Sequence, residues 1–516
     1  MGRKLVVFVF LLALVGISIR LFMAFLPLDT LITLTLYDDA FYYFKVAQNI
    51  VAGVGSTFDG VNRTNGYHPL WMLANLIAFA LFDSPGQSIR FLLLLCVALD
   101  LAAGTTIALI AYVLAKDIRI MPLMAAVWLL NYRVITATFT GLETGLSMLA
   151  IGVLFLAFYF AVGHPSSQST TLFGIASGFA FLSRTDNIIL VGLLFALLLI
   201  AVRRPHVLLA LPIAAGLSAP WIVWNWITFH SIIQTSAIAL KGFEIVQLTS
   251  TEQFIWNRLH VLLSLFFRTT MRLYAATALP FGKYVVLTLL WLALVLGASA
   301  QYLRHLWRKM STPRRWLVAA MLIWPFAFIC VHVFWRWSFR PHYYPSTFVS
   351  ILTWYSIAML GLITSPSILK RGIAMVVIPL ILVSFVQFVN SGLLQYQLEM
   401  KRAADWLNGR CEGRDICPTV GSFNAGILGF FYNGRVVNLD GVVNNEAVKA
   451  IYGRYLGAYI QREGIQCLAD FNEALRLDHP AWGWDNTPSF VVAYEHEQEY
   501  GGQAKRYIIY CFEELK

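Results

Sequence analysis

Long apolar runs of about 20 residues dominate the first 395 residues of the chain, and shorter segments of alternating apolar and polar residues follow them. The hydrocarbon core of a bilayer is about 30 Å thick, and a helix crosses it with roughly 20 apolar residues. The pattern therefore predicts a mostly α-helical, polytopic membrane protein with about eleven transmembrane helices. The predicted spans are residues 5–27, 89–115, 120–137, 143–162, 171–183, 187–202, 206–228, 282–303, 316–335, 342–364 and 372–394.

The apolar run 69–82 decides the topology, because counting it as a span would invert every later segment. If it lies along the membrane or dips into it, the loops on the side of the N-terminus contain thirteen Lys and Arg residues and a single acid, Asp117. Such loops are typical of the cytoplasmic side of a membrane. We therefore predict a cytoplasmic N-terminus and an external region from about residue 396. The loops in question are residues 1–4, 116–119, 163–170, 203–205, 304–315 and 365–371.

The composition excludes a soluble protein. Of the 516 residues, 59% are hydrophobic and only 13% are charged, and the mean hydropathy is +0.68. The net charge of +11 lies in the membrane part: residues 1–400 contain 26 Lys and Arg against 12 Asp and Glu, whereas residues 401–516 contain 12 against 15. Because the topology explains this excess of basic residues, no nucleic-acid partner is predicted.

Residues 396–516 are long enough for one small external domain. This leaves residues 1–395 as a transmembrane core with a long first external loop, residues 28–88. The pattern after residue 396 predicts an α/β domain. Its predicted strands are residues 418–423, 435–441, 467–471, 489–495 and 507–514, with a helix over 424–432. Asn424 and Asp440 would lie near strand ends, where open α/β sheets bind ligands; alternatively, they cap a helix and form a turn.

Four of the six cysteines lie in this external region, where disulfides persist. Three pairings of these four residues exist. We prefer Cys411 with Cys417 and Cys467 with Cys511, and free buried cysteines are the alternative.

Acidic and basic residues gather on the external side of the predicted topology. In the first external loop, Asp38 and Asp39 open an amphipathic helical segment, and His68 ends a stretch rich in turn-forming residues. The acidic pair could serve only as a helix cap. A carboxylate in this place could also activate a hydroxyl nucleophile as a general base.

Later loops add charged residues at the same membrane face. Charges so close to hydrocarbon are costly unless they pair with each other or take part in function. Arginine or histidine there could neutralise a phosphate leaving group, and a network of structural ion pairs is the alternative. Asp100, in the middle of a span, is expected to make a polar helix-packing contact. The loop residues are Glu143, Arg184, Asp186, Arg336, Arg340, His342 and Tyr343.

Short motifs on this face resemble those of the GT-C superfamily of integral-membrane glycosyltransferases. The similarity is greatest to the arabinofuranosyltransferase-like and protein-mannosyltransferase-like branches, and it covers most of the chain. The order of the motifs and their common side of the membrane carry the resemblance. They are DDAFY at 38–42, HPL at 68–70, GLET at 141–144, RTD at 184–186 and RPHYYP at 340–345.

The resemblance implies a reaction. Such enzymes transfer a sugar, usually with inversion, from a polyprenyl-phosphate carrier to a glycan, lipid or protein acceptor on the external face. Asp38 matches the first-loop acid proposed as the catalytic base in this family, and Asp39 is its neighbour, so the base is one of these two residues. Some relatives use a divalent cation, which the two aspartates could hold, although independence of metal is the preferred hypothesis.

The remaining motif residues are expected to bind the substrate. His68 falls where related enzymes carry His or Pro ahead of Pro-Leu, and Glu143 and Asp186 match acidic positions at the same face. Tyr343 could stack on a sugar ring. The looser matches for phosphate binding are Arg336, Arg340 and His342, with Arg184 beside Asp186 as either a substrate-binding residue or a local ion pair.

No motif for a nucleotide or a structural zinc is present: the sequence has no HExxH, no pair of CxxC motifs, no Walker motif and no dinucleotide-binding glycine pattern. The leading hypothesis is a polyprenyl-phosphate-sugar-dependent glycosyltransferase of the bacterial plasma membrane, with its C-terminal domain in the periplasm. A transporter or flippase of lipid-linked sugars is the alternative, since it would need the same cations but no general base. A membrane scaffold whose external domain binds a partner is the third hypothesis.

Overall fold

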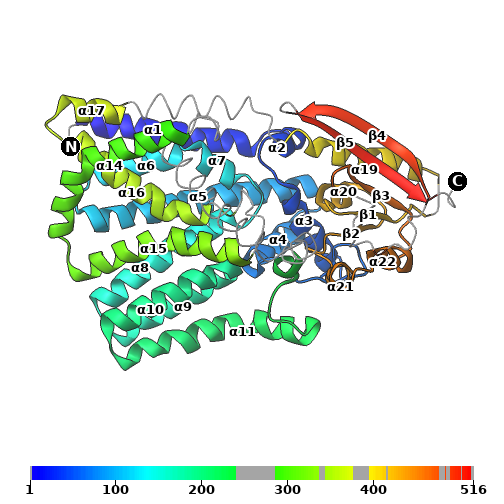
Figure 1. Cartoon of the computed structure of the whole chain (residues 1–516), viewed down its shortest axis with the longest axis horizontal. Coiled ribbons are helices and arrows are strands. Elements are labelled where there is room, and N and C mark those ends of the chain that lie inside the picture. The colour runs from blue at the N-terminus through cyan, green and yellow to red at the C-terminus, as the bar shows by residue number, and fades with distance from the viewer. Residues whose placement is uncertain are drawn as a thin grey trace.

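The computed structural model shows a bundle of long helices with a small mixed domain at one end (Figure 1). The N-terminus lies at the opposite end of the bundle from the C-terminal domain. This arrangement agrees with the predicted topology, in which the two lie on opposite sides of the membrane. The structure describes residues 3–239, 285–335, 343, 345–375, 394–413, 416–475, 483, 489–500 and 503–512.

Six of the described helices are long and apolar enough to cross a membrane, or eight spans result if two bent helix pairs are each counted as one. The predicted count of eleven is not confirmed, and the predicted span 372–394 lies mostly outside the described residues. The bundle consists of α1 (Arg3–Ala24), α5 (Pro85–Ala115), α6 (Ile120–Leu129), α7 (Tyr132–Thr138), α8 (Thr144–Gly163), α9 (Ser167–Ser183), α10 (Ile188–Val202), α11 (Ala210–Phe229), α14 (Val285–Arg308), α15 (Thr312–Trp335), α16 (Pro345–Ile363) and α17 (Ile368–Met375), with short 3-10 turns η1 (Thr185–Asn187) and η2 (Pro205–Leu209).

The predicted span 120–137 is formed by two helices, α6 and α7, which together are long and apolar enough for one span but meet at an angle of 62°. The side chain of Asn131 accepts hydrogen bonds from the backbone N–H groups of Arg133 and Val134. An asparagine that caps a new helix in this way satisfies N–H groups that the preceding helix does not reach. The polar residue therefore ends α6 and starts α7.

The first external loop folds into three helices, α2 (Leu28–Leu34), α3 (Asp38–Val51) and α4 (Pro69–Leu81). Helix α3 begins at Asp38, which confirms the predicted helix opened by the acidic pair. Helix α4 covers the ambiguous apolar run with 13 residues. At about 1.5 Å per residue it is roughly 20 Å long, short of the hydrocarbon core, which supports its omission from the predicted spans.

Asp100 makes the polar contact between helices that the sequence predicts. Its Oδ2 lies 2.5 Å from Arg20 Nε, and its Oδ1 accepts a hydrogen bond of 3.0 Å from Trp128 Nε1. Both charged side chains are fully buried. The contact joins α1, α5 and α6 inside the bundle, away from the external face, so it serves packing.

The C-terminal domain contains the five predicted strands and the predicted short helix. The strand order is β2-β1-β3-β5-β4, with β1 parallel to β2 and β3, and β5 antiparallel to β3 and β4. Its elements are α19 (Gln397–Cys411), β1 (Val420–Ser422), α20 (Gly426–Phe431), β2 (Val436–Asn438), α21 (Asn445–Gly453), α22 (Leu456–Arg462), β3 (Cys467–Phe471), β4 (Phe490–Tyr500) and β5 (Gln503–Phe512).

Both preferred disulfides are confirmed. Cys411 is joined to Cys417 at the end of α19, and Cys467 is joined to Cys511. The second bond links directly paired positions of β3 and β5.

The C-terminal domain packs tightly on the first external loop. Phe41 of α3 contacts the rings of Phe430 and Phe431 in α20, at centroid distances of 5.3 and 5.7 Å. Arg435 adds an ion pair to Asp59 of the loop, with 2.8 Å between Nη2 and Oδ2. The first loop and the C-terminal domain therefore share one apolar core, and the functional residues lie where they meet the bundle.

Candidate functional site

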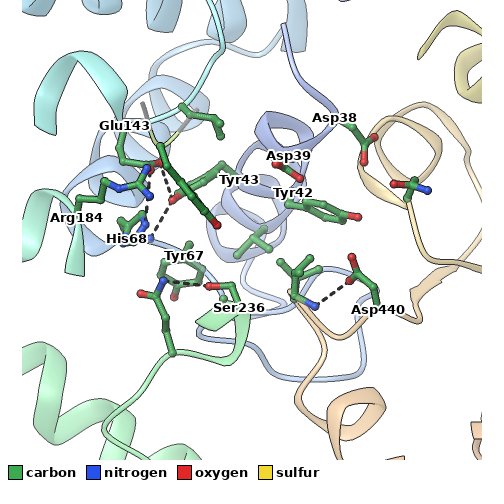
Figure 2. Close-up of a pocket in the computed structure, with 18 residues that line it drawn as sticks. Asp38, Asp39, Tyr42, Tyr43, Tyr67, His68, Glu143, Arg184, Ser236 and Asp440 are labelled. Carbon is green, nitrogen blue, oxygen red and sulfur yellow. Dashed lines mark hydrogen bonds and ion pairs between the residues drawn. The ribbon is translucent and has the colours of Figure 1, made fainter. Parts of the chain in front are cut away.

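A cavity of about 110 Å³ lies between the first loop, the bundle and the C-terminal domain (Figure 2). The sequence analysis predicted most of the charged residues that line it. These predicted residues are Asp38, Asp39, His68, Glu143, Arg184 and Tyr343, and Asn424 and Asp440 join them from the C-terminal domain. Segments far apart in the chain thus build one polar site at the end of the helix bundle that carries the C-terminal domain.

Asp38 binds the start of helix α20 in the C-terminal domain. Its Oδ1 accepts a hydrogen bond of 2.6 Å from the backbone N–H of Ile427, and its Oδ2 accepts one of 3.3 Å from Gly426. Burial raises the pKa of Asp38 to about 8, although both N–H groups lower it, and the charge of Asp39 adds to the rise. A carboxyl group whose pKa lies near neutrality is suited to proton transfer.

Tyr42 lies one helical turn after Asp38 and contacts the same part of the C-terminal domain. Its hydroxyl donates to the carbonyl oxygen of Phe423 at 3.2 Å and accepts from the N–H of Ala425 at 2.9 Å. Residues four apart share one face of a helix. This face of α3 therefore holds the C-terminal domain, while Asp39, the next residue after Asp38, also lines the cavity (Figure 2).

Arg184 lies between two carboxylates. Its Nε and Nη2 each donate to Asp186 at 2.9 Å, and its Nη1 donates to Glu143 at 2.9 Å. All three side chains are almost fully buried, so the alternative of structural ion pairs is confirmed for them. A guanidinium has five N–H donors, and among the described residues these bonds engage three of them; Arg184 also lines the cavity.

His68 contacts the same network from the first loop. The backbone N–H of Thr185 donates to His68 Nδ1 at 3.2 Å, which places the proton of the neutral ring on Nε2. Nε2 lies 3.5 Å from Glu143 Oε1. Tyr43 donates to the other oxygen of Glu143 at 3.1 Å. Three different elements therefore direct donors at Glu143.

His332 is a member of this network that the sequence analysis missed. Its Nε2 lies 2.9 Å from Asp186 Oδ2, on the side of Asp186 that also receives Arg184. The signal was present, because an ionisable residue inside a predicted span indicates a functional or paired position. The predicted span 316–335 was instead treated as apolar up to its end.

Tyr343 covers the guanidinium of Arg184, which lies 4.6 Å from the ring centroid. The ring also contacts His332, at a centroid distance of 5.5 Å. The contact between Arg184 and Tyr343 is a cation–π interaction. Tyr343, the aromatic residue predicted for the site, also lines the cavity. The other predicted residues of this loop, Arg336, Arg340 and His342, lie outside the described residues.

Asn424 and Asp440 form the wall contributed by the C-terminal domain. The prediction that Asn424 caps the short helix is wrong: its side chain donates to Asp470 at 2.8 Å, and Asp38 occupies the capping position. Asp440 does form the predicted turn, since its Oδ1 accepts from the N–H of Val442 and Gly441 has a φ of +83°. Both residues still lie at the ends of parallel strands, where a ligand was expected.

An apolar groove of about 450 Å³ lies beside the polar cavity. It runs between α8 and α9 and includes Leu70 of α4 and Ser183 at the end of α9. Leu70 comes two residues after His68, and Ser183 comes directly before Arg184. One end of the groove is therefore formed by residues that neighbour the charged residues of the cavity in the chain.

Among the described residues, no three His, Cys, Asp or Glu side chains are grouped as a metal site. The two oxygens of Asp38 face backbone N–H donors, which are not ligands for a cation. A divalent cation prefers oxygen ligands.

The fold is similar to that of solved membrane glycosyltransferases. ArnT from Cupriavidus metallidurans in the apo state matches with a TM-score of 0.55 and 13% identity, over 96% of this chain and 97% of that one. The same protein bound to undecaprenyl phosphate gives 0.54 and 15% over the same shares. An oligosaccharyltransferase from Archaeoglobus fulgidus, tethered with an acceptor peptide, gives 0.49 and 14%, over 90% of this chain and 69% of that one.

These likenesses show that the chain shares the fold of ArnT, as expected for a polytopic membrane protein with a small C-terminal domain. At such low identity they concern the fold alone. No protein-family model and no curated protein sequence matches the chain.

Proposed function

We propose that the protein is a glycosyltransferase that moves a sugar from a polyprenyl-phosphate carrier to an acceptor on the external face of the membrane. One observation carries the proposal: the residues at one end of the apolar groove between α8 and α9, Leu70, Leu146 and Ser183, are within three positions in the chain of His68, Glu143 and Arg184, which line the polar cavity. A lipid-linked donor needs both environments, side by side, at headgroup depth. ArnT, which shares the fold, has been solved with undecaprenyl phosphate bound.

The donor enters from the bilayer with its isoprenoid chain in the groove. Leu146, Leu149 and Val153 of α8 line this surface, and apolar contact contributes about 0.8 kcal/mol for each buried CH₂ group. The phosphate then reaches the end of α9. Arg184 and His68 contact it there, and the two N–H donors of Arg184 not used by Asp186 and Glu143 bind its oxygens.

The acidic pair acts on the acceptor. A carboxylate of Asp38 or Asp39 takes the proton of an acceptor hydroxyl, whose oxygen attacks the anomeric carbon of the sugar. The new bond forms as the bond from that carbon to the phosphate oxygen breaks, and the electron pair leaves with the polyprenyl phosphate. Attack from the side opposite the phosphate inverts the anomeric centre. The guanidinium of Arg184 near the phosphate stabilises the charge that develops on it.

The proposal also includes a location, the plasma membrane of a bacterium. The excess of basic residues in the loops on the N-terminal side favours a cytoplasmic N-terminus, and on this proposal the cavity and the disulfide-linked domain are in the periplasm. The acceptor, a glycan, lipid or protein, approaches from that side, along the wall that contains Asn424 and Asp440.

A transporter or flippase of lipid-linked sugars remains the alternative, because a groove next to a polar cavity suits both activities. The test uses purified protein in nanodiscs with a panel of radiolabelled polyprenyl-phosphate sugars and candidate acceptors. The proposal expects the label to move from the lipid to the acceptor. Label that stays on the lipid but changes leaflet in a vesicle assay would support the flippase instead.

A further inference from the structure

The turn from β1 into α20, residues 423–427, directs five successive backbone N–H groups at three side chains. One of these side chains, Asp470, belongs to the C-terminal domain, and the other two, Asp38 and Tyr42, belong to α3. Consecutive N–H groups of this kind make a favourable environment for carboxylates. The pairs in chain order are Phe423 and Asn424 to Asp470 Oδ2 (2.9 and 2.8 Å), Ala425 to the Tyr42 hydroxyl (2.9 Å), and Gly426 and Ile427 to Asp38 (3.3 and 2.6 Å).

Asp470 is a fully buried acid that does not line the cavity. A buried carboxylate is costly unless hydrogen bonds compensate for lost water. Its described bonds go to the turn and its surroundings, including the hydroxyl of Ser422 and the side chain of Asn424. Asp470 therefore fixes the turn from within the C-terminal domain, while Asp38 contacts it from the first loop.

A glycine is required at position 426, because the start of α20 lies so close to the start of α3. A Cβ atom at this position would collide with the backbone carbonyl oxygen of Asp38 and lie 2.9 Å from its Oδ1. A larger residue would push α20 away from the start of α3. The turn can therefore lie this close to Asp38 only because residue 426 has no side chain.

We propose that the β1–α20 turn is a positioning element for the acidic pair, so that the C-terminal domain completes the active site. The inference rests on the proposed glycosyl transfer and extends it. Held by Asp470 and brought close by Gly426, the turn fixes the carboxylate of Asp38 and, through α3, the direction of Asp39. Arg184 and the apolar groove lie on other elements, and the hydrogen bonds described for Arg184 go to Glu143 and Asp186.

The proposal predicts that displacing the turn lowers kcat but leaves the KM for the donor nearly unchanged. Displacing the turn moves a carboxylate that acts on the acceptor, and small misplacements of reacting groups cost about tenfold to a hundredfold in rate. The donor contacts are untouched, so the KM for the donor stays within about twofold. Loss of the two N–H donors also favours the protonated form of Asp38, so the pH at which kcat is half-maximal moves upward.

The experiment compares Gly426→Ala with the matched control Gly409→Ala in the full-length protein in nanodiscs. Gly409 lies in α19 of the same domain, and a Cβ there meets open space. The proposal expects the Gly426 variant to lose kcat by at least about tenfold with its pH midpoint raised, and the control to behave like the wild type. A folded Gly426 variant with unchanged kcat and unchanged pH midpoint would overturn the inference.

A second variant covers the case in which Gly426→Ala does not fold. Asp470→Asn keeps the size of the side chain but replaces an acceptor by an NH₂ donor facing backbone N–H groups. The proposal expects a lower kcat at similar donor KM, with faster amide hydrogen exchange over residues 423–427. Faster exchange with unchanged kcat overturns it. A wild-type protein that transfers no sugar overturns the proposed function itself, which keeps the two failures distinct.

Discussion

Asp38 Oδ1 accepts a hydrogen bond of 2.6 Å from the backbone N–H of Ile427, although the two residues are 389 positions apart in the chain. The contact joins the first external loop to the C-terminal domain at the edge of the cavity. Because burial raises the pKa of Asp38 while this N–H group lowers it, the contact also influences when the carboxyl group ionises. The side chain that holds the C-terminal domain is therefore also one of the two proposed to act as the base.

The first prediction concerns pH. In the folded protein the pKa of Asp38 is raised from 3.8 to about 8, so between about pH 4 and pH 8 the folded protein holds a proton that the unfolded chain releases. The unfolded state then binds fewer protons, and the free energy of unfolding falls as pH rises through this window. The Asp38→Asn variant lacks this fall. Thermal melts from pH 4.5 to 9 should therefore show the wild type losing stability relative to the variant, whereas parallel curves would contradict the raised pKa.

The second prediction concerns the buried ion pairs of Arg184. Arg184→Gln leaves Glu143 and Asp186 without their shared cation, and breaking a buried pair costs about 3–5 kcal/mol. We expect a clearly lower melting temperature in detergent. The control is Arg119→Gln, whose ion pair with Asp117 is largely exposed and should change stability by at most about 1 kcal/mol. Equal melting temperatures for the two variants would show that Arg184 is not held as described.

The third prediction concerns the apolar groove. Val153→Trp should fill part of the groove and raise the KM for a long-chain donor about tenfold, roughly the loss of two buried CH₂ groups, with kcat unchanged. The matched control is Ile200→Trp on α10, which is also exposed on the helix bundle but does not line the groove. A water-soluble donor with a short chain should not distinguish the variants. Equal effects on short and long donors would contradict a role of the groove in binding the lipid.

The sequence predicted the local features of this protein well. Hydrophobic periodicity predicted the helices of the bundle and the strands of the C-terminal domain, and the acidic pair predicted the start of α3. The sequence analysis did not predict the bend within 120–137, because an asparagine in an apolar run is a weak signal for a bend. It also treated His332 as part of an apolar span, although an ionisable residue there indicates a partner.

The parts of the site that the sequence did not predict depend on contacts between distant segments. His332 lies 146 residues from Asp186, and Asp470 is linked to α3 through the turn before α20. No periodicity or motif encodes such contacts, since they follow from how the C-terminal domain packs on the first loop. The charged face was predictable from topology, whereas the division of its residues into ion pairs and cavity walls required the structure.

The most direct test of the account measures sugar transfer by purified wild type, Asp38→Asn and Asp39→Asn, each in nanodiscs with the donor that the wild type uses. A general base contributes about 10² to 10⁴ in rate. The account predicts turnover by the wild type and a loss of at least about a hundredfold in a folded variant of the residue that acts as base. Turnover by both folded variants at the rate of the wild type would contradict catalysis by the acidic pair.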